Sequence, residues 1–194
     1  MAAPGYRRDH AQHATLPDSS RIYLRRVREA DLRLGPAFFA ALSPRSRYLR
    51  LMQQANRLPP STLAQLRSQL RDPRCMVLAA FADHVGGDEL VGGGRIVPTG
   101  RREVCEFALT VVDAWQGRGV GRVLMRELTR AARRLGYRWI EGYALPINTG
   151  MLKLARISRL APSPLPADPQ LVRLSRRLFL TNRPTDWPTD RPTH

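Results

Sequence analysis

The sequence predicts one α/β domain of the α+β kind, with a mixed, mostly antiparallel central sheet and helices on both faces. Its 194 residues suffice for one domain with a substantial core but are few for two. Apolar residues make up 43% of the chain, a value typical of globular proteins. Apolar runs of strand length dominate the first half, and strands then alternate with helices, which predicts the mixed sheet.

The first third predicts one strand followed by three helical segments. Residues 1–20 are polar and lack periodicity, so we expect a disordered lead. Residues 21–27 alternate as a strand. A helix with acidic residues at its start follows and is interrupted or restarted at Pro36. Ser43 and Ser61 each precede a helical segment as an N-cap.

The middle of the chain predicts a β-hairpin, a strand and a long helix. Apolar runs at 75–81 and 89–97 flank the turn signal at 86–88. Residues 104–112 form the next strand. Residues 120–135 then carry an apolar face opposite a row of arginines, and Gly136 ends this helix.

The last third predicts a strand, a helix, a loop and a final strand. The strand covers 137–145, and Asn148 caps the next helix. Four prolines between 162 and 169 predict a loop, and residues 171–180 alternate as a strand. The Pro/Thr/Asp-rich tail has nothing to bury. The predicted organisation is therefore a lead (1–20), a domain (21–178) and a disordered tail (179–194).

The composition indicates which partners and which cellular compartment to expect. The formal net charge is +16 and the isoelectric point is about 11.5, which favours polyanions such as nucleic acid, a phosphorylated ligand or an acidic protein surface. Lys153 is the only lysine, so arginine-rich codon usage explains the same excess. No apolar run is long enough for a membrane span, and the first residues lack the apolar core of a signal peptide. Cys75 and Cys105 lie in apolar runs as reduced, buried thiols would, and together these features predict a cytoplasmic protein.

A glycine-rich turn joins the 104–112 strand to the long helix. Glycines at 117, 119 and 121 allow close approach of the backbone, and a helix N-terminus attracts phosphate. A tight turn without a ligand explains the glycines equally well. A dinucleotide fingerprint would need glycine where Arg122 stands, and a P-loop would need a lysine before Lys153.

The turn resembles the Q-x-x-G-x-G motif of the GNAT acyltransferase superfamily, with Gln116, Gly119 and Gly121 in the pattern positions. The stretch "CEFALTVVDAWQGRGVGRVLMREL" and its continuation to Arg156 are similar to the catalytic domain of bacterial Pat-type protein lysine acetyltransferases. The resemblance covers about 21–178. It implies a GNAT-type mixed sheet and acetyl-CoA-dependent N-acetylation without a metal.

The resemblance also implies the residues that bind acetyl-CoA. The turn would bind its pyrophosphate through main-chain amides, the preceding strand would pair with its pantetheine arm, and an asparagine would lie beside that arm. The implied residues are Leu109, Val111, Gln116, Gly117, Arg118, Gly119, Val120, Gly121, Arg122 and Asn148. The side chains of Arg118 and Arg122 either add contacts to phosphate or are solvated, and Asn148 is also a plain N-cap.

Glu106 is the candidate general base. A lysine ammonium has a pKa of about 10.4, so a base must remove a proton before the amine attacks. Strand alternation places Glu106 with the small residues Ala108 and Thr110 on one face. An ordinary exposed glutamate is the alternative. The family's usual tyrosine acid is replaced by Ala155, which leaves Tyr143 as a weaker candidate.

Three functions follow from these observations. The first is acetylation of a protein with an exposed lysine. The second is acetylation of a small amine such as a polyamine, an aminoglycoside or an amino acid. The third, not favoured, is a nucleic-acid-binding module without catalysis. We expect a monomer or a homodimer without a membrane partner.

Overall fold

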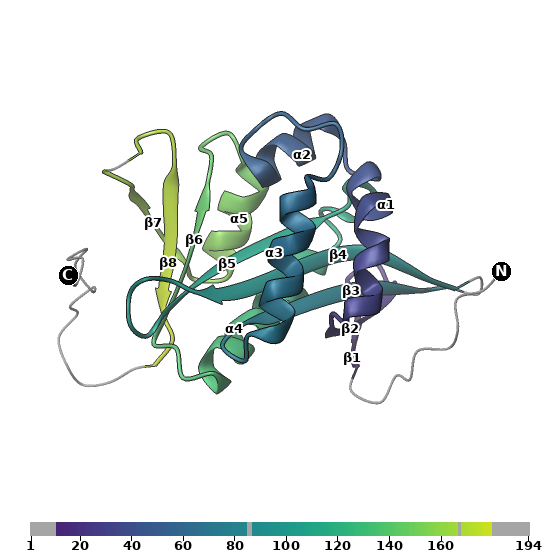
Figure 1. The fold of residues 1–194 in the computed structure, drawn as a ribbon, viewed down its shortest axis with the longest axis horizontal. Coiled ribbons are helices and arrows are strands. Elements are labelled where there is room, and N and C mark those ends of the chain that lie inside the picture. Colours follow the sequence, from purple (N-terminus) through teal and green to yellow (C-terminus); the bar gives the residue numbers. More distant parts are fainter. Residues whose placement is uncertain (1–10, 85–86, 167, 180–194) are drawn as a thin grey trace.

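The computed structural model describes residues 11–84, 87–166 and 168–179, and it contains one eight-stranded sheet with helices on both faces (Figure 1). The strand order is β1-β2-β3-β4-β5-β6-β8-β7. The first five strands are β1 (Gln12–Thr15), β2 (Arg21–Arg26), β3 (Met76–His84), β4 (Gly87–Pro98) and β5 (Val104–Val111). The others are β6 (Trp139–Ala144), β7 (Ala161–Pro164) and β8 (Val172–Arg177). Among the described strands, β5 and β6 alone pair in parallel, which confirms the predicted mixed, mostly antiparallel sheet.

The first helical segments cover one face of the sheet. They are η1 (Glu29–Leu34), α1 (Gly35–Ala40), α2 (Pro44–Leu51) and α3 (Pro60–Arg71). Pro36 lies in the first turn of α1, so the helix restarts there as predicted. In Figure 1, α3 crosses the near face of the sheet.

The long helix α4 (Val120–Arg134) packs on β3, β4 and β5 from the opposite face. Its apolar face is buried, as its sequence pattern predicts. Close packing requires glycine on β4, because a Cβ added at Gly94 would lie 2.9 Å from the Leu128 side chain. The remaining helical elements are η2 (Asp113–Trp115) and α5 (Thr149–Ile157).

Two edge strands correct the predicted organisation. Residues 11–20, expected within the disordered lead, include β1, which pairs with β2 and is followed by the buried Leu16. The predicted proline loop contains β7, which pairs with β8. Proline is compatible with an edge strand, because one side of that strand needs no ladder hydrogen bonds. Residues 1–10 and 180–194, which hold the rest of the predicted lead and nearly all of the predicted tail, lie outside the described part of the chain.

The sheet opens between β5 and β6. These strands pair only over the first three residues of each, from Val104 with Trp139 to Glu106 with Glu141. Beyond these pairs, no strand within residues 11–84, 87–166 and 168–179 pairs with the β6-facing edge of β5, whereas its other edge stays paired with β4 as far as Val111. The fold therefore places Glu106 where the two strands separate. Among the described residues, no helix combines the length and the apolar character that crossing a membrane requires.

Candidate active site

The glycine turn presents main-chain donors to the open end of β5. Gly117 has a φ of 74° and Gly119 a φ of 109°, conformations that side-chain-bearing residues rarely adopt. Gly119 is the N-cap of α4, and no described side chain caps the first turn of this helix. The unpaired N–H groups of that turn, with the positive end of a 15-residue helix, form a site suited to an anion.

Two polar side chains fasten this turn to α2. Gln116 donates from Nε2 to the carbonyl of Val111 at 3.0 Å and to Ser46 Oγ at 3.2 Å. Asp113 accepts hydrogen bonds from Ser43 N and from Ser46 Oγ, both at 2.8 Å. Burial opposes ionisation of Asp113, but these hydrogen bonds hold its pKa below the ordinary value. The predicted Gln116 is thus placed to shape the turn, since its amide is already committed to protein partners.

A cleft of about 350 Å³ runs from this turn between the end of β5 and α5. It brings together most of the residues predicted to bind the donor. Those that line it are Leu109, Val111, Gln116, Gly117, Gly119, Gly121, Arg122 and Asn148. Val120 does not line it, because its side chain is fully buried beneath the turn. Asn148 Oδ1 accepts from Met151 N at 3.0 Å, so this residue is an N-cap and a lining residue at once.

The side chain of Arg118 is turned away from the cleft. Its guanidinium donates to Asp18 and to Ser20 Oγ, both at 2.5 Å, and lies 4.0 Å from the centre of the Trp115 ring. The hydrogen bond from Arg118 and the bonds from Ser20 lower the pKa of Asp18 to about 2. A phosphate contact from Arg118 would therefore come from its main-chain amide, since its side chain fastens the segment after β1 to the turn.

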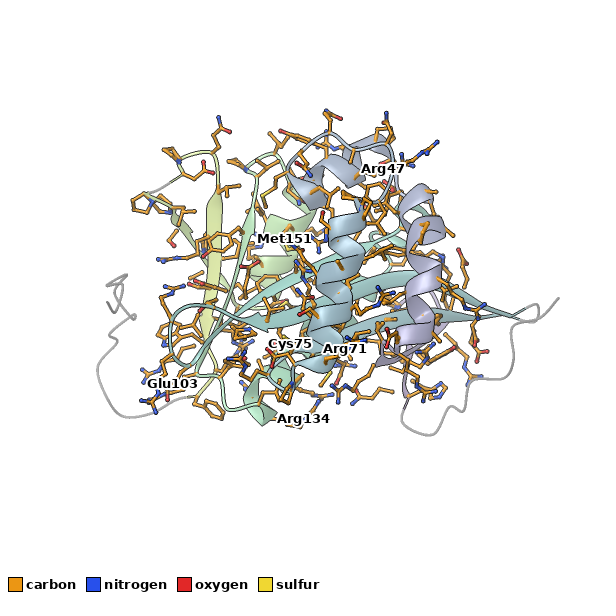
Figure 2. All side chains as sticks on the ribbon, viewed as in Figure 1. Arg47, Arg71, Cys75, Glu103, Arg134 and Met151 are labelled. Carbon is orange, nitrogen blue, oxygen red and sulfur yellow. The ribbon has the colours of Figure 1, made fainter. Side chains whose placement is uncertain are left out.

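Sequence reasoning missed several residues of the cleft. The additional lining residues are Ser46, Leu49, Arg50, Thr110, Trp115, Gly150, Met151, Lys153, Leu154 and Ile157. Those on α5 follow Asn148 at helical spacing, a pattern that could have identified them. Met151 is visible on α5 in Figure 2. Lys153, the only lysine of the chain, is exposed and joins Arg50 and Arg122 in giving the cleft three cations.

Glu106 is half-buried and lies among charged groups from three elements. Burial raises the pKa of Glu106 above its ordinary value, and the negative charge of Glu141 on β6 acts in the same direction. The positive charges of Arg95 on β4 and Arg50 on α2 oppose the shift. A raised carboxyl pKa suits a group that must accept a proton near neutral pH.

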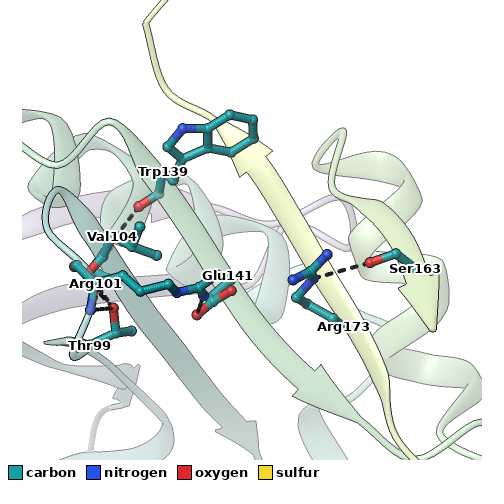
Figure 3. A network of polar contacts seen from close by, with 8 residues as sticks. Thr99, Arg101, Val104, Trp139, Glu141, Ser163 and Arg173 are labelled. Carbon is teal, nitrogen blue, oxygen red and sulfur yellow. Dashed lines mark hydrogen bonds and ion pairs between the residues drawn. The ribbon is translucent and has the colours of Figure 1, made fainter. Parts of the chain in front are cut away.

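The neighbouring Glu141 is itself fully buried. Arg101, from the loop before β5, donates to Glu141 Oε1 and forms an ion pair with it (Figure 3). Two residues along β6, Tyr143 has its pKa raised to about 12, chiefly by burial and then by the charge of Glu141. Tyr143 therefore keeps its proton at neutral pH.

A second cavity, of about 150 Å³, lies between α1–α3 and the sheet. Its walls are mostly apolar, and they include Ala108 and Thr110 from the Glu106 face of β5. Arg50 and Thr110 line both this cavity and the cleft, so the two spaces meet at these residues. Glu106 lines neither cavity, but lies on the same strand face two residues before Ala108.

The family follows from comparison with known proteins. The acetyltransferase (GNAT) family model matches residues 41–156, which include β5, the glycine turn and nearly all of α5. The chain belongs to the GNAT acetyltransferase family. It is 31% identical, over 140 residues, to acetyltransferase PA5475 of Pseudomonas aeruginosa, covering 72% of this chain and 75% of that protein. The protein is thus an acetyltransferase, as the resemblance of the turn implies.

Two solved structures share the fold. The GNAT domain of S. lividans PAT superposes with a TM-score of 0.75 at 23% identity, covering 89% of this chain and 99% of that domain. The structure of yncA from Salmonella typhimurium, which contains its cofactor acetyl-CoA, gives a TM-score of 0.63 at 18% identity, covering 84% and 98% of the two chains. At these identities the likeness shows the fold alone.

Proposed function

We propose that the protein transfers an acetyl group from acetyl-CoA to a primary amine, with a protein lysine as the acceptor and Glu106 as the general base. One observation supports this proposal above all. Glu106 lies where β5 and β6 separate, on the strand face whose next two residues, Ala108 and Thr110, line the second cavity, and Thr110 also lines the cleft of the glycine turn. A donor in the cleft and an acceptor in the second cavity would meet near this carboxylate.

The cleft fits acetyl-CoA. The uncapped first turn of α4 supplies N–H donors for a diphosphate, and Arg122 and Lys153 add positive charge beside it. The β6-facing edge of β5 from residue 107 onward lacks a strand partner, so its main chain is available to pair with the amides of pantetheine. The acetyl-CoA held by yncA supports the same assignment here.

The chemistry uses the two titratable groups at the strand junction. Glu106 accepts a proton from the acceptor ammonium, and the freed amine attacks the thioester carbon. The new C–N bond forms, the C–S bond breaks, and the attacking nitrogen passes its second proton to the group that protonates the departing thiolate, while Glu106 releases the first proton to solvent. The thiolate takes one proton from that group. Tyr143 is the candidate donor of that proton, because it stays protonated at neutral pH. A main-chain N–H near Val111 would stabilise the oxyanion.

The charges around the second cavity disfavour a polyamine acceptor. Its charged lining residues are Asp31, Arg50 and Arg95. Asp31 accepts hydrogen bonds from the buried Arg25 at 2.6 and 2.9 Å, so its negative charge is already neutralised and does not attract a polycation. A lysine side chain enters with a single ammonium on an apolar stem, which suits the apolar walls better.

The arginine row of α4 gives little support to nucleic-acid binding. Arg126 and Arg130 pair with the buried Glu127 at 3.0 and 2.8 Å. Arg133 donates to the carbonyl of Leu178 at 3.0 Å. Three of the five arginines of α4 therefore contact the protein itself. A cytoplasmic location remains our expectation, supported by the free, buried Cys75 and Cys105.

Mass spectrometry tests the proposal directly. The protein is incubated with acetyl-CoA and a library of lysine peptides, in parallel with the polyamine spermidine. We expect acetylated lysine that depends on both the enzyme and acetyl-CoA, and little acetylated spermidine. Acetylation of spermidine alone would overturn the acceptor class, and acetylation of no amine would overturn the proposed reaction.

A further inference from the structure

Arg50 is a half-buried cation placed at the meeting point of the two cavities. It lies in the last turn of α2 and lines both the cleft and the second cavity. No side chain or carbonyl among the described residues forms a hydrogen bond or an ion pair with its guanidinium. Burial, with the nearby charge of Arg95, lowers the pKa of Arg50 to about 10. A guanidinium removed from water without an anion costs free energy, so this position calls for a partner from outside the chain.

Two further donors lie close to Arg50. Arg95 on β4 pairs with Ala108 in the sheet ladder, so its side chain shares the face of Ala108 and Thr110. Among the described residues, its guanidinium forms one hydrogen bond, from Nη1 to Gln69 Oε1 at 3.2 Å. The hydroxyl of Thr110 is buried and has no hydrogen-bond partner among the described residues. Arg50, Arg95 and Thr110 thus line one cavity, and most of their hydrogen-bond donors have no acceptor among the described residues.

The carboxylates of this region cannot neutralise both arginines. Asp31 is bound bidentately by Arg25 and also accepts from the main-chain N–H of Arg28 at 2.7 Å. Glu106 interacts with both Arg50 and Arg95 through space, but forms no ion pair with either within 4.0 Å. The second cavity therefore carries an excess of positive charge.

We propose that Arg50, with Arg95 and Thr110, binds a carboxylate that the acceptor carries beside its reactive amine. This inference rests on the proposed function and names the acceptor class for that same site. A carboxylate between two guanidinium groups forms charge-assisted hydrogen bonds, and it offsets the repulsion that the two arginines exert on an incoming ammonium. The carboxylate has two sources: an acidic residue next to the acceptor lysine, or the α-carboxylate of a free amino acid.

Two matched acceptor pairs test the inference and separate these sources. One pair consists of peptides with Glu or Gln next to the same lysine, and the other of a free apolar amino acid and its amide. Rates are measured for the wild-type protein, for Arg50→Gln and for the control Arg45→Gln, which changes an exposed arginine of the same helix that donates to the carbonyl of Ile147.

We expect the wild type to prefer the charged member of one pair by about 10- to 100-fold in kcat/KM, the range for a buried charge-assisted contact. Arg50→Gln should bring that ratio close to one without changing the KM for acetyl-CoA, and Arg45→Gln should keep the ratio. Equal rates within both pairs for the wild type would overturn the inference alone. An Arg50→Gln variant with a raised KM for acetyl-CoA and an unchanged ratio would also overturn it, because Arg50 would then serve the donor. Acetylation of none of the four acceptors would instead overturn the proposed function, and the inference with it.

Discussion

Replacement of Glu106 by Gln separates base catalysis from substrate binding. The amide keeps the size of the side chain but cannot accept the proton of an ammonium. At pH 7 an amine with a pKa of about 10.4 is neutral in roughly one molecule in 2,500. The variant must rely on that fraction, so we expect its kcat/KM for the acceptor to fall by about 10³-fold.

The pH dependence makes this prediction specific. The wild-type rate should decline as the pH falls through the pKa of Glu106, which burial and Glu141 place above 4.5 against the opposing charges of Arg95 and Arg50. The variant should not show this decline at the pKa of Glu106. Its rate should instead rise about tenfold per pH unit until the pH reaches the pKa of the amine.

Steady-state kinetics from pH 5 to pH 10 measure both effects, with calorimetric binding of acetyl-CoA expected to be unchanged. Glu103→Gln is the control, because Glu103 is an exposed carboxylate just before β5. A Glu106→Gln variant with the wild-type rate and the wild-type pH profile would remove Glu106 from catalysis. A variant that instead loses affinity for acetyl-CoA would assign Glu106 to donor binding.

Three further substitutions probe the scaffold of the site. Gly119→Ala should lower the free energy of unfolding by about 1–2 kcal/mol and weaken acetyl-CoA binding, because φ is 109° and the new Cβ would lie 3.2 Å from Pro17 Cδ. Chemical denaturation measures the loss of stability, and calorimetry measures the loss of affinity. Wild-type values for both would contradict the geometry of the turn. Gly142→Ala should destabilise by about 1–3 kcal/mol in urea unfolding, because the added Cβ would lie 2.6 Å from the Phe107 ring, and unchanged stability would show that the ring can move aside. Asp113→Asn should lower the free energy of unfolding by about 0.5–1 kcal/mol at pH 7. This difference from the wild type should shrink as the pH falls below about 3.9, because the lowered pKa of Asp113 contributes stability only while the carboxyl is ionised. A difference in unfolding free energy that persists at pH 2 would contradict this origin.

Local sequence signals were sufficient for the elements that surround the turn. The apolar face of α4, the cap at Asn148 and the alternation of β5 each depend on residues close in the chain, and each was found within one or two residues. The positions of Glu106 and the glycine turn followed, because both are fixed by those elements.

Long-range contacts explain what was missed. β1 and β7 are short edge strands without clear alternation, and they are held by pairing with β2 and β8. Arg118 is paired with Asp18, a hundred residues away, so no local pattern could reveal where its side chain points. Arg50 lines the cleft only because hydrogen bonds with Asp113 and Gln116 hold α2 beside the glycine turn, a placement that the sequence of α2 does not reveal.

Hydrogen–deuterium exchange with and without acetyl-CoA tests whether the glycine turn and the open edge of β5 bind the donor. We expect acetyl-CoA to slow exchange in residues 117–122 of the glycine turn and in residues 107–111 of β5, while β1 and β2 exchange as before. Unchanged exchange in both segments at saturating acetyl-CoA would contradict the assignment of the cleft.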